Sequence, residues 1–219
     1  ISIYRKFGDY QKALNLLNEV IETYSNDDNF HNTKGNVLGF DLGEFQNAII
    51  EYNFAIHIDS TASPYYRNRA KMYEKLEEYD TAILDFTKAI DFYSANDGYS
   101  LSERHIERAE CYEKMGNYDK ALYDYNLAID LDPHNKSHFN DRGLFYYDYS
   151  KYDLAFEDFE SILKIDPSYT YALNNRALIY SKKGDLESAI KEHTRAIEIA
   201  PTSTLSYRNR AIDYEKLEE

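Results

Sequence analysis

Residues 102–135 read SERHIERAECYEKMGNYDKALYDYNLAIDLDPHN, and this stretch decides the fold. It ends just after a proline, Pro133, and the chain places further prolines at Pro167 and Pro201. Three of the four prolines are therefore separated by 34 residues and again by 34. A fixed period of this length indicates a chain built from repeated structural units, each of which packs on its neighbours.

The 34-residue period extends over the whole chain, with two insertions. Residues 97–101 lengthen one unit by five residues, and one extra residue near Leu42 lengthens another. We expect a single solenoid over residues 1–219. Its repeat units are 1–27 (partial), 28–62, 63–101, 102–135, 136–169, 170–203 and 204–219 (partial).

Each unit repeats the same residue types at the same positions. Position 20 is alanine in every available copy, namely Ala13, Ala48, Ala82, Ala121, Ala155 and Ala189. Position 8 is glycine or alanine, position 11 is mostly tyrosine, and position 15 is glycine in four copies. Positions 4, 8 and 11 share one face of a helix, and positions 20, 24 and 27 share a face of a second helix. Glycine between the two helices and proline after them end each helix in turn, so every unit predicts two antiparallel helices.

This pattern resembles the tetratricopeptide repeat (TPR) family, whose units carry a small residue at position 8, tyrosine at 11, alanine at 20 and 27, an aromatic residue at 24 and proline at 32. The resemblance covers the whole chain and implies an all-α fold, a right-handed superhelical solenoid of antiparallel helix pairs. The family's tryptophan at position 4 is replaced here, and His193 stands at one position 24. The best match is the unit 102–135, with Ala109, Tyr112, Gly116, Tyr118, Ala121, Tyr125, Ala128 and Pro133.

The composition describes a folded acidic protein. Lys and Arg number 25 against 39 Asp and Glu, which gives a net charge of −14, while 43% of the residues are hydrophobic. No apolar run exceeds four residues, so we expect no membrane span, which needs roughly 18. The acidic balance repels phosphate and argues against a nucleic-acid partner. The single cysteine, Cys111, excludes a disulfide framework and leaves the compartment open, although we favour the cytoplasm.

Catalytic chemistry is not expected. Six of the eight glycines lie at repeat positions, which leaves no glycine-rich phosphate loop. Cys111 falls beside Tyr112, where a buried small hydrophobe is a better interpretation than a nucleophile. His134 and His138 are four residues apart but straddle a predicted turn, which does not favour a metal site. We therefore expect no enzyme activity, no cofactor and no metal.

Comparison of the internal copies also reveals a charge pairing. Position 7 is basic in every copy, and position 23 is acidic in every complete unit. Position 7 flanks the core-facing side of the first helix, so its charge must be paired to be tolerated. We predict salt bridges between packed helices and keep an anion-binding ladder as the alternative. The bases are Lys34, Arg69, Arg108, Arg142, Arg176 and Arg210, and the acids are Glu51, Asp85, Asp124, Asp158 and Glu192.

The TPR resemblance implies that the first helix of each unit lines a concave groove through positions 2, 5, 6, 9, 12 and 13. Read at these positions, the groove is basic in unit 63–101, acidic in unit 102–135 and polar beyond. Asparagine recurs at positions 5 and 6, and its amide can hydrogen-bond the backbone of an extended peptide. A solvated helix face would also be polar, so that alternative stays open. The candidate groove residues are Arg67, Asn68, Lys71, Lys75, Glu103, Glu107, Glu110, Asn140, Asp141, Tyr147, Asn174, Asn175, Arg208 and Asn209.

The banded charges predict the kind of ligand that the groove prefers. Arg67, Asn68 and Lys71 resemble part of the carboxylate clamp of some TPR proteins, but Glu103 and Glu107 stand where a further cation is needed. We therefore expect no full clamp. An extended ligand whose charges complement the bands would suit the groove instead, and its affinity should fall with salt.

We predict a non-catalytic interaction scaffold, or adaptor, that binds a peptide or protein segment in this groove. An alternative is that the chain forms the targeting or regulatory arm of a larger enzyme, because it starts at Ile1 rather than at methionine and stops within a repeat unit at Glu219. The full-length gene would discriminate between the two. Neither reading identifies the partner.

The last segment of the chain predicts self-association. Residues 66–78 and 207–219 agree at 11 of 13 positions, which makes the last segment a first helix without its second. Tyr207, Ala211 and Tyr214 would then leave an apolar stripe open at that end. Repeat arrays normally close such ends with polar capping units. We therefore expect either fraying of residues 204–219 or end-to-end self-association of the truncated array.

Overall fold

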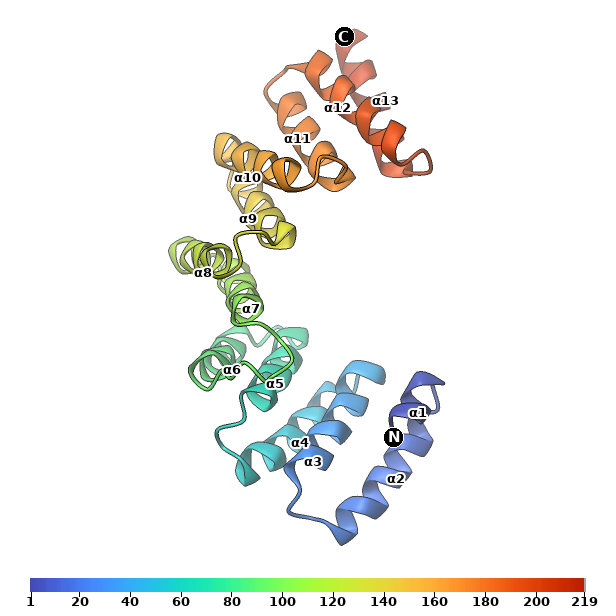
Figure 1. The fold of residues 1–219 in the computed structure, drawn as a ribbon, viewed down its shortest axis with the longest axis vertical. Helices are drawn as coiled ribbons and strands as arrows, with labels where there is room; N and C mark the ends of the chain where they lie inside the picture. Colours follow the sequence, from blue (N-terminus) through green and yellow to red (C-terminus); the bar gives the residue numbers. More distant parts are fainter. Residues whose placement is uncertain (219) are drawn as a thin grey trace. The chain divides into compact units, whose positions relative to one another are not determined.

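The computed structural model describes residues 1–218. The last residue of the predicted unit 204–219 lies outside the described residues. The described residues form thirteen α-helices and one π-helical segment, with no β-strand (Figure 1). The all-α fold predicted from the sequence is confirmed. The first helices are α1 (Ser2–Lys6), α2 (Tyr10–Thr23), α3 (Asp28–Asn36), the π-helical segment η1 (Val37–Asp41), α4 (Phe45–Ile58), α5 (Ser63–Lys75) and α6 (Tyr79–Asp91). The others are α7 (Leu101–Lys114), α8 (Tyr118–Leu131), α9 (Lys136–Asp148), α10 (Tyr152–Ile165), α11 (Thr170–Lys182), α12 (Leu186–Ile199) and α13 (Thr204–Glu218).

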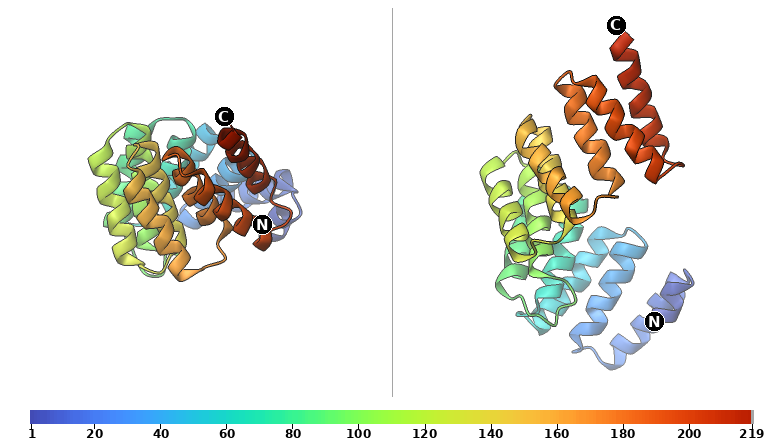
Figure 2. Two further views of the ribbon diagram at one scale, coloured as in Figure 1. Left: turned by 90° about the horizontal axis from the view of Figure 1, so that it is seen from above. Right: turned by 45° about the horizontal axis from the view of Figure 1, so that its top comes forward.

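The chain divides into two compact parts, an N-terminal part, Ile1–Ala128, and a C-terminal part, Ile129–Glu219. In the N-terminal part, each helix from α3 to α6 packs against the next one along the chain. In the C-terminal part, the helices from α9 to α13 follow the same rule, and Figures 1 and 2 show α11, α12 and α13 side by side from different directions. Each part is therefore a row of helices in sequence order. None of the helices in residues 1–218 is both long and apolar enough to cross a membrane.

Close helix pairs depend on the small residue at position 8. A Cβ atom added to Gly35 would lie 2.6 Å from Cε1 of Tyr52, and one added to Gly143 would lie 2.8 Å from Cε1 of Phe159. Tyr52 and Phe159 are fully buried at position 24 of the paired helix. The aromatic ring therefore occupies the space that a larger residue at position 8 would need.

The predicted salt bridges between positions 7 and 23 are confirmed. Arg69 donates to Asp85 from Nε and Nη2 at 2.6 and 2.7 Å, and Arg108 donates to Asp124 at 2.8 and 2.8 Å. Equivalent ion pairs join Lys34 to Glu51, Arg142 to Asp158 and Arg176 to Glu192. These pairs hold the first helix of a unit to its second helix, so the recurring charges are structural.

The one-residue insertion in unit 28–62 appears as η1. The Leu42 N–H donates to the Val37 carbonyl at 3.1 Å, a π-type bond between residues five apart. A π-turn of this kind accommodates an extra residue without shifting the register of the whole helix. The segment passes close to α5, where Gly39 lies against Met72 with no room for a Cβ atom. Val37, Leu38 and Gly39 face the core as a result.

Candidate functional site

A cavity of about 450 Å³ lies within the N-terminal part, and we call it the N-terminal cavity. Its walls come from α1, from α3 with η1, from α5 and from the loop that precedes α7. First helices of successive repeat units therefore meet here. The lining residues are Arg5, Asn32, Asn36, Phe40, Pro64, Arg67, Asn68, Lys71 and Tyr99.

Three asparagines on facing helices form a hydrogen-bonded amide cluster in this cavity. Nδ2 of Asn68 donates to Oδ1 of Asn32 at 3.0 Å and to Oδ1 of Asn36 at 3.1 Å. The Tyr52 hydroxyl donates to the same Oδ1 of Asn36 at 2.9 Å. These bonds occupy both lone pairs of the Asn36 oxygen. The NH₂ groups of Asn32 and Asn36 have no partner among residues 1–218 and remain as donors at the cavity wall.

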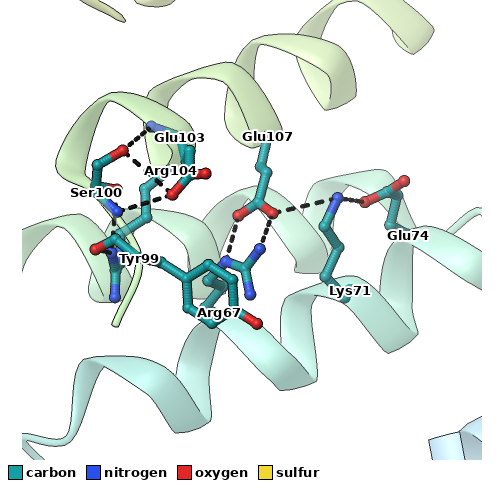
Figure 3. A network of polar contacts seen from close by, with 8 residues as sticks. All are labelled: Arg67, Lys71, Glu74, Tyr99, Ser100, Glu103, Arg104 and Glu107. Carbon is teal, nitrogen blue, oxygen red and sulfur yellow. Dashed lines mark hydrogen bonds and ion pairs between the residues drawn. The ribbon is translucent and has the colours of Figure 1, made fainter. Parts of the chain in front are cut away.

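Two arginines of the lining are fixed by carboxylates. Arg5 donates to Asp41 from Nε at 2.5 Å and from Nη2 at 3.1 Å. Arg67 donates to Glu107 in the same way, at 2.8 and 2.5 Å (Figure 3). A guanidinium has five N–H groups and two of them are used here. The bidentate pairs therefore fix the arginine orientations and leave Nη1 of each side chain able to donate.

Lys71 is the third cation of the lining. Its Nζ lies 2.9 Å from Glu74 and 3.5 Å from Glu107, so Arg67 and Lys71 share the Glu107 carboxylate (Figure 3). Burial lowers the pKa of Lys71, but the charges of Glu107 and Glu74 outweigh burial and raise it overall. Lys71 therefore stays charged at neutral pH.

The loop before α7 completes the cavity with Tyr99. The Arg67 guanidinium carbon lies 3.7 Å from the centre of the Tyr99 ring, which is a stacked cation–π contact. Ser100 begins α7 with a capping box, in which its Oγ accepts from the Glu103 N–H at 3.2 Å and Glu103 accepts from the Ser100 N–H at 2.8 Å (Figure 3). The capping box fixes the end of the loop at Ser100, and the preceding residue, Tyr99, contacts Arg67 of α5.

The side chain of Arg104 anchors this loop by binding its backbone carbonyls. Arg104 was not among the residues predicted from the sequence. Arg104 is fully buried, and its Nη1 donates to the carbonyls of Tyr99 and Ser100 at 2.8 and 3.2 Å. Its Nη2 lies 3.2 Å from Asp97, and burial lowers its pKa. Arg104 occupies position 3, where the buried equivalents in other units are Tyr65, His138, Ala172 and Ser206. A charged residue in that buried column was the signal that could have revealed it.

The structure brings together only some of the groove residues predicted from the sequence. Arg67, Asn68 and Lys71 line the N-terminal cavity. Glu107 lies behind them as the partner of Arg67, with its side chain 10% exposed, and Glu103 caps α7. The basic and acidic bands thus neutralise one another within the protein.

The remaining predicted groove residues lie elsewhere. Lys75 and Arg208 are exposed, while Glu110, Asp141, Tyr147 and Asn209 are partly exposed. In the C-terminal part, Nδ2 of Asn175 donates to Oδ1 of Asn140 at 3.3 Å, and Asn174 is buried with its Nδ2 bonded to the Thr170 carbonyl. A second cavity, of about 310 Å³, lies beside Asn174 and Tyr171 between α11 and the loop that follows α12.

Asn32, Asn36 and Phe40 were not among the predicted groove residues, although they stand at positions 5, 9 and 13 of unit 28–62. Applying the groove positions to that unit would have found them. Arg5 stands at position 12 of the partial first unit and was predictable in the same way, whereas Tyr99 carried no such signal because it belongs to an insertion. Nothing in the described residues indicates a metal site, since no group of three or more His, Cys, Asp or Glu side chains converges there. Cys111 is fully buried, and burial raises the pKa of its thiol to about 12.

Comparison with protein families agrees with the helix pairing. Models of the tetratricopeptide repeat match residues 2–27, 63–96, 102–135 and 159–191, which together make up more than half of the chain. The chain belongs to the tetratricopeptide repeat family. A search of curated proteins found no match to this TPR protein.

Several solved structures share its fold at low sequence identity. The C-terminal part of a TPR repeat-containing protein from Cytophaga hutchinsonii is 17% identical, with a TM-score of 0.79, and the match covers 97% of this chain and 82% of that one. PilF of Pseudomonas aeruginosa is 16% identical, with a TM-score of 0.70 and coverage of 95% and 92%. YrrB, described as a TPR protein with an unusual peptide-binding site, is 22% identical, with a TM-score of 0.65 and coverage of 89% and 97%.

Proposed function

We propose that this TPR protein is a non-catalytic scaffold that holds an extended segment of a partner protein in the N-terminal cavity. The observation that carries the proposal is the composition of the lining. It contains three cations and three asparagines but no carboxylate, although acids outnumber bases by 39 to 25 in the chain. Each cation is paired with a carboxylate outside the lining, but the wall itself presents N–H donors, which favours a ligand rich in acceptors.

An extended peptide supplies acceptors of two kinds. Its backbone carbonyls accept from amide NH₂ groups such as those of Asn32 and Asn36, and acidic side chains accept from Arg5 and Lys71. Hydrogen bonds to charged groups are stronger than neutral ones and also fix the direction of the ligand. The peptide-binding site of YrrB, which has the same fold, supports a peptide as the ligand class.

A peptide array tests this function. Purified protein is applied to immobilised acetylated peptides of varied charge, and the same array is repeated with Asn32→Ala and with Lys71→Gln. We expect acidic peptides to bind and both variants to weaken them about tenfold, as the loss of a charge-assisted hydrogen bond implies. Lys191→Gln, a change at an exposed lysine of α12, serves as the matched control and should bind as the unaltered protein does. Acidic peptides that bind equally to all the variants would contradict the proposal.

A further inference from the structure

The two insertions that break the 34-residue period both deliver an aromatic ring to the same cavity. The extra residue of unit 28–62 creates η1, which carries Phe40. The insertion 97–101 carries Tyr99. Both rings line the N-terminal cavity, and they are 49% and 48% exposed, respectively. The most irregular features of the repeat array thus meet in one site.

The segments that carry the two rings are both anchored to the rest of the N-terminal part. Asp41, the neighbour of Phe40, forms the bidentate pair with Arg5, which ties η1 to α1. The backbone of Tyr99 is bonded to Arg104, and its ring is stacked on Arg67. Burying a guanidinium is unfavourable unless its hydrogen bonds are made, and Nε of Arg104 has none among residues 1–218. The protein therefore retains a costly anchor that serves to position this loop.

The chemistry of the lining identifies what the rings would contact. Exposed aromatic faces bind other aromatic side chains by offset or edge-to-face contacts. The cations beside them are each paired with a carboxylate, so they act through their remaining N–H groups, which donate hydrogen bonds to an acceptor such as a ligand carboxylate. The volume of about 450 Å³ falls within the range of about 300–1,000 Å³ that small-ligand pockets occupy. The site can thus hold more than a single charged group.

We propose that the N-terminal cavity is a specificity pocket for a peptide motif in which an aromatic residue stands next to an acidic residue. The aromatic side chain packs against Phe40 and Tyr99, while the neighbouring carboxylate accepts hydrogen bonds from Arg5, Lys71 and the asparagine amides. This inference rests on the proposed function and adds the sequence preference. In this proposal the repeat helices provide the hydrogen-bond donors. The insertions provide the two aromatic rings that favour an aromatic residue in the ligand.

Fluorescence anisotropy with defined probes tests the inference. The probe is the labelled peptide Gly-Ser-Asp-Phe-Asp-Ser-Gly-amide, compared with a peptide in which Ala replaces Phe and with one in which Asn replaces both Asp residues. We expect the first peptide to bind about tenfold more tightly than either of the others. Phe40→Ala and Tyr99→Ala should each remove most of the preference for Phe over Ala, whereas Tyr99→Phe, which keeps the ring, should retain it.

Tyr123→Ala is the matched control, because Tyr123 is an exposed tyrosine outside the cavity, on α8. It should leave the preference unchanged, and circular dichroism should show all the variants folded, since both cavity rings are half exposed. Equal affinity for the Phe and Ala peptides, or a preference that survives in Tyr99→Ala, overturns the inference. The inference is also overturned if none of the three labelled peptides binds measurably to the unaltered protein. The proposed function fails separately, if acidic peptides on the array do not respond to Asn32→Ala and Lys71→Gln.

Discussion

The buried pair of Arg108 and Asp124 should be a main stabilising contact between α7 and α8. Asp124 is 1% exposed in its side chain and accepts from Arg108 twice and from His105 Nδ1 once, all at 2.8 Å. Removing one partner of a buried ion pair costs about 3–5 kcal/mol. Because His105 would still contact the carboxylate, we expect Arg108→Ala to lower the free energy of unfolding by about 2–3 kcal/mol.

The reciprocal change completes a double-mutant cycle. Asp124→Ala leaves Arg108 with its bond to Thr87 at 3.0 Å and with some access to water, since its side chain is 14% exposed. We expect this variant to lose about 1–3 kcal/mol. The double variant should lose less than the sum, with a coupling of about 1–3 kcal/mol. Urea unfolding followed by circular dichroism measures each free energy, and Lys191→Ala should stay within about 0.5 kcal/mol of the unaltered protein.

The pH dependence of this pair has a defined sign. Burial raises the pKa of Asp124, but Arg108 and His105 outweigh it, so the pKa is lowered overall. A carboxylate with a lowered pKa stabilises the fold above its unfolded pKa of about 3.9, and this stability is lost as the pH falls. The deficit of Arg108→Ala should therefore shrink in acid. Strictly additive losses in the cycle, or a deficit that does not shrink below about pH 4, would refute the reasoning.

The remaining predictions concern turns, packing and assembly. Ser150 adopts a left-handed backbone, with φ of 56°, so Ser150→Gly should raise the free energy of unfolding by about 0.5–1 kcal/mol, whereas Gly184→Ser should lower it. Gly35→Ala should cost about 1–3 kcal/mol in thermal or urea unfolding, because the new Cβ meets the Tyr52 ring. In α13, Tyr207, Tyr214 and Leu217 are 44%, 49% and 50% exposed. Light scattering should therefore detect association that grows with concentration, and a strict monomer with a fully protected α13 would contradict it.

The repeated features were predictable because the sequence contains several copies of each. Alanine at position 20 and the charge pair at positions 7 and 23 recur, and a residue type that recurs in step with another implies a shared contact. The small residue at position 8 was likewise explained by helix approach, as the contact of Gly35 with Tyr52 shows. The fold and its internal salt bridges could thus be derived without a structure.

The features that occur once could not be derived in this way. Tyr99 lies in an insertion with no counterpart in another unit, so no comparison showed which way its ring would point. Arg67 and Glu107 are 40 residues apart and were assigned to opposite charge bands, yet they bind each other. The consequence is practical, because Glu107→Lys would place a third cation beside Arg67 and Lys71 and would disturb the fold rather than only a ligand contact.

The contacts that anchor the loop before α7 join residues that are close together in the sequence. Every partner named for Arg104, from the ring of Tyr93 through Asp97 to the carbonyl of Ser100, lies within the preceding eleven residues. Short-range contacts of this kind close small loops and lose little chain entropy. Residues 93–104 therefore form a cassette, meaning a locally closed segment whose anchoring contacts to Arg104 come from its own sequence. A repeat array that carries such a cassette can acquire a new binding preference through changes in the cassette, while the contacts between helices continue to stabilise the fold.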